Sequence, residues 1–161
     1  PFLPGTQNYE AKEILYFCVK NFPKINFEFI GDASADFKES LSFSNVKFLG
    51  RVENYLDVLS GCSVLLAPYP DHSRLLAGKT KLLEGGACQM AVLTSETGAL
   101  GHPKNLFLEA KSKNDYLEKI QYLQDEKARI SIGKKLRSEI SEKYNVDIET
   151  KKLIKLYEEL F

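Results

Sequence analysis

The sequence has no excess of charge of either sign, because 22 Lys and Arg residues balance 22 Asp and Glu residues. A nucleic-acid-binding domain usually carries a basic excess, so this balance disfavours that class of protein. No apolar run approaches the roughly 20 residues that a membrane-spanning helix needs, and no signal peptide opens the chain. Charged residues make up 27% and apolar residues 43% of the chain, which is typical of a folded protein and not of a disordered one.

Cysteine and histidine are also scarce. The three cysteines, Cys18, Cys62 and Cys88, are odd in number, far apart and set among apolar residues. They indicate reduced core thiols of a cytosolic protein, not disulfides or metal ligands. Turn chemistry accounts for His102, between a glycine and a proline, whereas His72 follows a predicted strand and is either exposed or in contact with a substrate. No Ser-His-Asp or Cys-His pair is indicated.

An initiator methionine is missing, since the chain begins Pro1-Phe-Leu-Pro4, and we therefore expect a fragment or a processed chain. Its 161 residues suit a single domain around one core. Hydrophobic periodicity predicts helices over residues 8–21, 55–60 and 81–87 and from 114 onward, with strands over 27–31, 46–50, 64–67 and 90–94 and an edge strand over 105–109. Nearly continuous apolar strands that alternate with helices predict an α/β fold. We expect a Rossmann-like, doubly wound parallel sheet covered on both faces.

The predicted last helix, over residues 147–161, carries an apolar stripe wider than a single core-facing side needs. The simpler interpretation, which we favour, is that it packs against the sheet or a neighbouring helix. The alternative is that part of it docks on a second domain. Asp32 directly follows the first predicted strand, which ends in Gly31, and we expect it to cap a helix or, less favoured, to line a cleft.

The segment Gly78-Lys-Thr-Lys81 follows a buried strand and precedes a helix that carries Glu84. Backbone N–H groups at a helix start, together with lysines, favour phosphate, and the carboxyl edge of a parallel sheet is where open α/β folds bind ligands. A P-loop is excluded, because Ser73 occupies the position where that motif needs its first glycine. The pattern therefore predicts a nucleotide-sugar site.

Four ordered segments carry a resemblance to a known family: Phe48-Leu-Gly-Arg-Val-Glu53, Cys62-Ser-Val-Leu-Leu-Ala-Pro-Tyr69, Lys81-Leu-Leu-Glu-Gly-Gly-Ala-Cys88 and Val92-Leu-Thr-Ser-Glu-Thr-Gly-Ala-Leu-Gly101. Together they resemble the C-terminal, donor-binding domain of retaining GT-B glycosyltransferases of the glycosyl transferases group 1 family, which builds surface glycans. The resemblance runs from about residue 8 to the last helix, and residues 1–161 would form half of a GT-B fold.

The resemblance implies that the backbone after the second strand holds the base, that the glutamate grips the ribose hydroxyls, and that the loop faces the diphosphate. Carboxylate-to-hydroxyl contacts need no metal, and lysines there stabilise the charge that develops as the sugar–phosphate bond breaks. No cofactor is implied beyond the donor itself. The expected catalytic residues are Lys81 and Lys79, and the expected substrate-binding residues are Gly50, Arg51, Val52, Gly78, Thr80, Glu84 and His72. The alternatives without a functional role are that Glu84 is a solvent-facing helix residue and that Lys79 and Lys81 are solvated loop residues. Arg51 and Arg74 are candidates for phosphate contact or surface residues.

Three positions depart from the family pattern. Leu76 stands where a first glutamate is common, residues 4–8 hold no basic residue, and Gln89 and Ala91 replace a usual Gly and Pro, so we expect that stretch to turn differently. A non-catalytic domain that serves as a binding or interaction module is therefore the alternative function. A receiver-type signalling domain is disfavoured, because its central strand would end in aspartate and not in Ala67-Pro68.

The expected whole enzyme is a cytoplasmic protein that transfers sugar from a nucleoside diphosphate sugar to a glycan or lipid-linked acceptor, with retention. Its acceptor would bind an N-terminal domain, and the enzyme could associate with the inner face of the membrane. We expect no nucleic-acid partner. Alone, the chain would bind nucleotide weakly and catalyse little.

Overall fold

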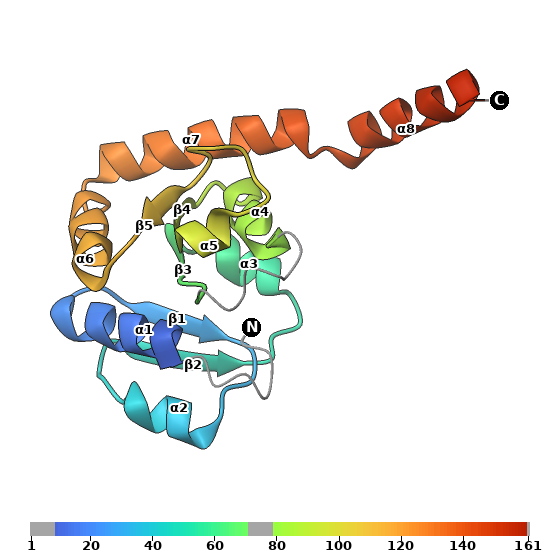
Figure 1. Ribbon diagram of the computed structural model, residues 1–161. Helices are drawn as coiled ribbons and strands as arrows, with labels where there is room; N and C mark the ends of the chain where they lie inside the picture. Colours follow the sequence, from blue (N-terminus) through green and yellow to red (C-terminus); the bar gives the residue numbers. More distant parts are fainter. Residues whose placement is uncertain (1–8, 71–78, 161) are drawn as a thin grey trace.

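The computed structural model describes residues 9–70 and 79–160, in which helices and strands alternate up to residue 122 and further helices follow (Figure 1). Each strand pairs in parallel with its neighbours. Hydrogen bonds group the strands of the described residues into a two-stranded sheet, β1-β2, and a three-stranded sheet, β3-β4-β5. The strands are β1 (Phe27–Ile30), β2 (Val46–Gly50), β3 (Val64–Ala67), β4 (Ala91–Ser95) and β5 (Leu108–Ala110).

Helices follow or connect these strands, and several begin at a residue whose side chain caps the first turn. Ser34, Ser95, Ser112 and Asp125 each accept a hydrogen bond from the backbone N–H three residues ahead, which satisfies a donor that the helix itself leaves unpaired. The helices are α1 (Tyr9–Asn21), α2 (Ala35–Ser40), α3 (Tyr55–Ser60), α4 (Thr80–Ala87), α5 (Glu96–Ala99), α6 (Lys113–Tyr122), α7 (Glu126–Lys143) and α8 (Val146–Leu160).

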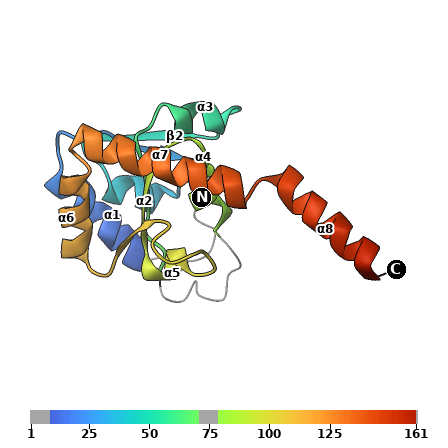
Figure 2. The same cartoon turned by 90° about the horizontal axis from the view of Figure 1, so that it is seen from above.

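The three-stranded sheet is covered on both faces, as the continuous apolar strands predict. Along β4, Ala91 and Leu93 pack into one cluster of buried residues and Val92 into another, and all three are fully buried. Because successive strand residues point to opposite faces, these two clusters lie on the two sides of the sheet. The α/β class and the parallel sheet are thus confirmed. Figure 2, seen from above, shows α7 lying across this part of the molecule.

The predicted edge strand over residues 105–109 is wrong in its position. The strand is β5, which begins at Leu108, while Leu106 and Phe107 are buried in the irregular segment before it. Asn105 has a φ of 61°, in the left-handed region, and this breaks the extended conformation. The short helices α2 and α5 were not predicted, whereas the bounds of β2, α3 and β3 agree with prediction.

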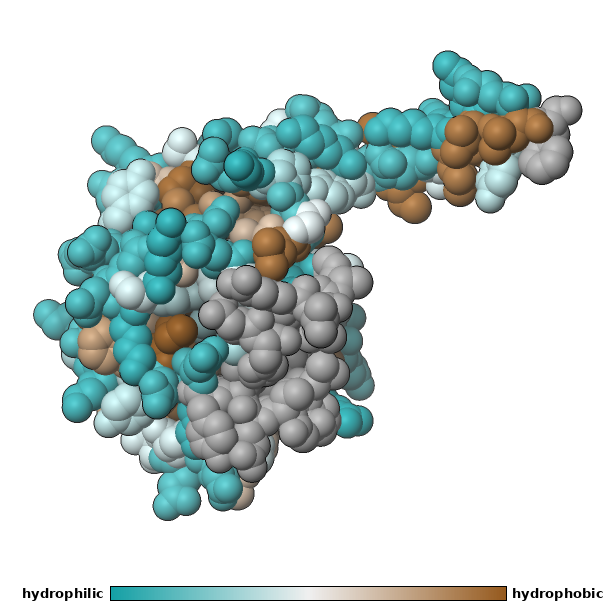
Figure 3. Space-filling model, in the orientation of Figure 1, coloured by the Kyte–Doolittle hydropathy of each residue, from teal (hydrophilic) through white to brown (hydrophobic). Residues whose placement is uncertain are grey.

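The last helix, α8, extends away from the rest of the described chain, and each of its residues is exposed. Its apolar side chains range from 39% exposed at Ile148 to 74% at Val146. The space-filling view in Figure 3 shows these hydrophobic residues gathered along the helix. Our favoured expectation, that this helix packs against the sheet or a neighbouring helix, is therefore wrong. Asn145 starts the helix, since its Oδ1 accepts a hydrogen bond from the Asp147 N–H at 2.9 Å.

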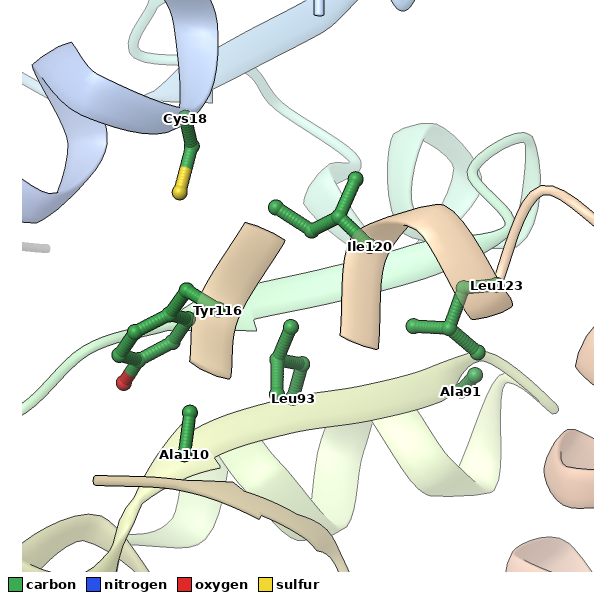
Figure 4. Close-up of a cluster of buried hydrophobic side chains, with 7 residues drawn as sticks. All are labelled: Cys18, Ala91, Leu93, Ala110, Tyr116, Ile120 and Leu123. Atoms are coloured by element: carbon green, nitrogen blue, oxygen red, sulfur yellow. The ribbon is translucent and has the colours of Figure 1, made fainter. Parts of the chain in front are cut away.

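One of the buried clusters joins α1, α6, β4 and β5 (Figure 4). Its residues are Cys18, Ala91, Leu93, Ala110, Tyr116, Ile120 and Leu123. The Cys18 side chain is fully buried, and burial raises the pKa of its thiol to about 12. This confirms the expected core role for Cys18, while Cys62 and Cys88 are only half-buried; all three are free thiols.

Close backbone approach holds α7 against the other face of the sheet. A Cβ added at Gly133 would lie 2.0 Å from the carbonyl oxygen of Gln89, and one added at Gly86 would lie 2.4 Å from Ile140. Glycine at both positions lets α7 pack onto α4 and the turn before β4. Gln89, with a φ of 63°, takes the left-handed conformation that glycine adopts most easily.

Candidate functional site

The candidate site lies where β3 ends and α4 begins. Val64–Ala67 pairs in parallel with β4 up to Thr94, and the chain continues through Pro68 to Tyr69. Lys79 is the N-cap residue of α4. Its Nζ lies 5.6 Å from the centroid of the Tyr69 ring, so the start of the helix returns to the carboxyl end of the strand. This edge is where parallel α/β sheets bind ligands.

Lys79 is buried, with only 5% of its surface exposed. Its ammonium lies within the range of a cation–π interaction with Tyr69, which offsets part of the cost of removing the charge from water. Burial lowers the pKa of Lys79, because a low-dielectric environment disfavours the charged form. A lysine held in this way is a preorganised positive charge at a helix start.

His102 lies beside this lysine. Both of its ring nitrogens are buried and have no hydrogen-bond partner within the described residues. The ring packs edge-on against Phe107, with centroids 5.1 Å apart, and lies 6.1 Å from the ring of Tyr144. Burial, and then the positive charge of Lys79, lower the pKa of His102. The imidazole is therefore neutral near pH 7, and turn chemistry alone does not account for its position.

Glu84 lies on α4, five residues or about one and a half turns beyond Lys79, and is half-buried. Burial, and then the Glu84 charge, raise the pKa of Tyr69. Burial and a side-chain hydrogen bond to Glu84 raise the pKa of Tyr55, the first residue of α3. The carboxylate thus lies between the end of β3 and the start of α3. A surface glutamate without partners does not fit these contacts.

The expected base-binding segment is at the end of β2. Gly50 has a φ of 66°, and its carbonyl accepts a hydrogen bond from the Gly31 N–H at 2.7 Å. The exposed Arg51 side chain forms an ion pair with Asp32, at 2.8 Å between Nε and Oδ2. Our expectation that Asp32 caps a helix is therefore wrong, because the N-cap residue of α2 is Ser34.

The structure brings only some of the expected residues together. Lys79 and Glu84 both interact with Tyr69. Thr80 and Lys81 are exposed on the first turn of α4, and within the described chain Lys81 forms no ion pair with Glu84. Val52 is half-buried, three residues before Tyr55. The remaining sites named from the sequence, His72, Arg74, Leu76, Gly78 and residues 4–8, lie outside the described residues.

Sequence reasoning missed Tyr69, Tyr55 and Ser95. The Ser95 hydroxyl accepts hydrogen bonds from the N–H groups of Tyr69 and Gly98, each at 3.1 Å, and donates to the Tyr69 carbonyl at 2.7 Å. It therefore caps α5 and fixes the chain that leaves β3. The position of Tyr69 between two prolines, directly after a buried strand, is a signal that could have identified it.

Other features of the described residues do not compete with this site. Over residues 9–70 and 79–160, no three His, Cys, Asp or Glu side chains gather as metal ligands would. Nor does this part of the chain contain a helix long and apolar enough to cross a membrane. An open hollow of about 390 Å³ beside α1 is lined by Lys12, Glu13, Tyr16, Phe17, Ser40 and Lys113, none of which belongs to the candidate site.

Known structures share this fold. A point mutant of S. aureus TarM, solved with UDP, fondaparinux and alpha-GlcNAc-glycerol, superposes with a TM-score of 0.74 at 18% identity, over 97% of this chain and 34% of TarM. Anabaena HepE, solved with UDP and glucose, gives 0.69 at 19% identity over 98% of this chain and 46% of HepE. The C-terminal domain of LpcC, a glycosyl transferase group 1 family protein of Francisella tularensis, gives 0.61 at 21% identity, over 88% of this chain and 80% of that domain.

The chain thus spans about a third of the length of TarM and 46% of that of HepE. No curated protein matches the sequence. The family described as "Glycosyl transferases group 1" matches residues 7–126, which is most of the chain. Through that match and its GT-B, Rossmann-like fold, the chain belongs to the group 1 family of glycosyltransferases.

Proposed function

We propose that the chain is the donor-binding domain of a glycosyltransferase that moves a sugar from a nucleoside diphosphate sugar to a glycan or lipid-linked acceptor, with retention. One observation carries this proposal: a buried lysine at the start of α4 lies over Tyr69 at the carboxyl end of β3, and a half-buried glutamate five residues later acts electrostatically on the same tyrosine. Opposite charges in this arrangement suit a ligand with an anionic end and a hydroxyl-bearing end.

The chemistry of the two ends is complementary to a nucleotide. At the start of α4, backbone N–H groups and the Lys79 ammonium favour a diphosphate. The Glu84 carboxylate is suited to the paired hydroxyls of a ribose, because hydrogen bonds to a charged acceptor are strong. The UDP in the solved structures of TarM and HepE supports the assignment to a nucleotide.

In the proposed reaction, negative charge grows on the departing diphosphate as the bond from sugar to phosphate breaks. Lys79, fixed over Tyr69, stabilises that charge, and Lys81, exposed on the first turn of α4, is placed to assist. Thr80 and the Gly78 segment would contact the phosphates, and the backbone of Gly50, Arg51 and Val52 would hold the base. We propose that no metal and no other cofactor takes part.

The proposed enzyme also needs a domain that binds the acceptor, because the relatives TarM and HepE are two to three times as long as the matched region. We propose that the exposed apolar side of α8 docks on that domain of the same polypeptide. Its charged residues comprise three lysines and four carboxylates. This balance is unsuited to an anionic membrane, which attracts basic helices, and suits a protein surface. The enzyme would be cytoplasmic, with access to acceptors at the inner face of the membrane.

Calorimetric titration of the chain with UDP, GDP and ADP tests the donor site. We expect one nucleotide to bind saturably, with unchanged affinity in EDTA, and Glu84→Ala to weaken it at least about tenfold, as the loss of a charge-assisted hydrogen bond predicts. Glu118→Ala, which removes an exposed glutamate from α6, is the matched control and should have no effect. If the folded chain binds none of the three nucleotides, the non-catalytic interaction module replaces this proposal.

Amide hydrogen exchange tests the docking of α8. The helix should exchange quickly in this chain alone and slowly in a polypeptide that includes the acceptor domain. A dimer of the isolated chain that Leu153→Ser abolishes would identify a second copy as the occupant instead. Binding of the chain to anionic phospholipid vesicles, lost in the same variant, would identify a membrane.

A further inference from the structure

We propose that Tyr69 is a positioning residue of the nucleotide site, whose ring holds the Lys79 ammonium at the phosphate end. This inference rests on the proposed function of the same site. It assigns to one side chain the role of fixing the positive charge that would meet the phosphates.

The backbone of Tyr69 is fixed from both sides. Ser95 Oγ accepts a hydrogen bond from the Tyr69 N–H at 3.1 Å, and the same hydroxyl donates a hydrogen bond to the Tyr69 carbonyl at 2.7 Å. Pro68 and Pro70 flank the residue and are buried. Because proline fixes its own φ and restricts the residue before it, few backbone conformations are open to Tyr69.

The ring of Tyr69 is held by packing. A Cβ added at Gly98 would lie 2.8 Å from Tyr69 Cδ2, so the ring lies directly against the backbone of α5. The same ring packs against the buried cluster that contains Leu82 and Val92. Ring and backbone are thus both immobilised by elements outside the ligand site, which is what positioning requires.

The fixed ring contacts Lys79, and the charge of Glu84 acts on the same tyrosine. The Lys79 Nζ is 5.6 Å from the ring centroid, and Lys79 is 5% exposed, so the ring helps to shield the ammonium group from solvent. Glu84 acts on the Tyr69 hydroxyl, whose pKa it raises in addition to the larger effect of burial. An aromatic ring can serve both neighbours, since its face attracts a cation and its hydroxyl can donate to a carboxylate.

The test compares the affinity for each nucleoside diphosphate with that for its nucleoside, using UDP with uridine, GDP with guanosine and ADP with adenosine. The ratio isolates the phosphate end of the site. Tyr69→Leu should reduce this ratio roughly 2- to 30-fold, the range that corresponds to the loss of a cation–π contact. Tyr69→Phe keeps the ring and should therefore keep the ratio of the unmodified chain. Tyr122→Leu, which removes an exposed tyrosine from α6, is the matched control and should change neither affinity.

An unchanged ratio in folded Tyr69→Leu overturns the inference but leaves the nucleotide site intact, as does an equal loss in Tyr69→Phe. Absence of nucleotide binding by the unmodified chain overturns both proposals. A second measurement covers the case in which Tyr69→Leu does not fold. In the unmodified chain, the Lys79 Hε resonances should be shifted upfield by the ring current of Tyr69, and unshifted resonances contradict the contact.

Discussion

α7 and α8 are successive helices separated only by Tyr144 and Asn145, but their surroundings differ completely. α7 buries Gly133, Leu136 and Ile140 against α4 and the turn before β4. α8 buries none of its residues, although it carries the larger apolar stripe.

The comparison teaches that the amount of apolar surface does not decide which helix packs. Close approach of the backbone decides it. Gly133 lets α7 approach the backbone of Gln89, and Gly86 lets α4 approach the α7 side chains Leu136 and Ile140. α8 has no glycine and no facing element within the described chain. Its apolar side therefore indicates a partner outside these residues, in agreement with the proposed docking.

The largest effect should come from shortening a side chain under α7. Leu136→Ala, at a position 3% exposed, should cost about 2–5 kcal/mol of unfolding free energy, because it removes buried methyl groups and leaves a cavity. Ile130→Ala on the same helix, at a position 42% exposed, is the control and should cost far less. Urea denaturation measures both. Equal losses would mean that α7 does not pack as described.

Gly133→Ala should have the next largest effect, about 1–3 kcal/mol, which is typical of overpacking. The new methyl group meets a backbone carbonyl oxygen that cannot rotate away, so the clash outweighs the better helix propensity of alanine. Ser131→Ala, at an exposed position of the same helix, is the control and should be neutral. A Gly133→Ala variant as stable as the parent chain would contradict the close approach.

A smaller effect is expected from pH at the end of α7, where His102 contacts the C-cap residue Tyr144. Burial and Lys79 lower the pKa of His102 in the folded chain, so on acidification the unfolded chain takes up the proton first. The contribution of His102 to stability is therefore complete above its unfolded pKa of about 6.5 and is lost as pH falls below that value toward the folded pKa.

The free energy of unfolding, measured by denaturation between pH 7.5 and 5, should fall on acidification in the unmodified chain. His102→Phe, which keeps an aromatic ring against Phe107, should show a smaller fall. Carboxylates whose pKa is lowered by partners, such as Asp115, are common to both chains and cancel in the difference. Parallel profiles for the two chains would mean that the His102 environment does not favour the neutral imidazole.

The smallest effect should come from α8. In this chain alone, the double variant Leu153→Ser and Leu160→Ser should change the free energy of unfolding by no more than about 0.5 kcal/mol, since both side chains are exposed. The same variant should destabilise a polypeptide that includes the docked domain. A loss above about 1 kcal/mol in the isolated chain would show that α8 packs in solution and would remove the contrast with α7.

The sequence predicts the elements that carry strong periodic patterns. The continuous apolar runs of β3 and β4 and the glycine-ended β2 are found where they were expected, as is the helix that carries Glu84. α2 was missed because it is short and buries none of its residues; its N-cap, Ser34, was its clearest signal. The start of β5 was misplaced because the buried residues Leu106 and Phe107 belong to an irregular segment.

At the site, the sequence identified the charged residues but not their neighbours. The spacing of Lys79 and Glu84 on one helix is a local property. The contact of Lys79 with Tyr69 and the effect of the Glu84 charge on that tyrosine depend on how α4 folds back on β3, and the contact between Glu84 and Tyr55 depends on the packing of α3. Side-chain contacts between elements distant in sequence require the tertiary structure, and so the positioning residue was not foreseen.

Because the Cys18 thiol is buried, its rate of chemical labelling can report how often the core opens. Thiolates, not thiols, react with maleimides, and a thiol with a pKa of about 12 in a fully buried position is nearly inert at neutral pH. Cys62 and Cys88 are half-buried and within easier reach of reagent. The native chain should therefore gain its labels at Cys62 and Cys88 before the one at Cys18, which requires α1 to lift from α6 and β4, so that mass spectrometry over time records the rate at which that cluster opens under native conditions.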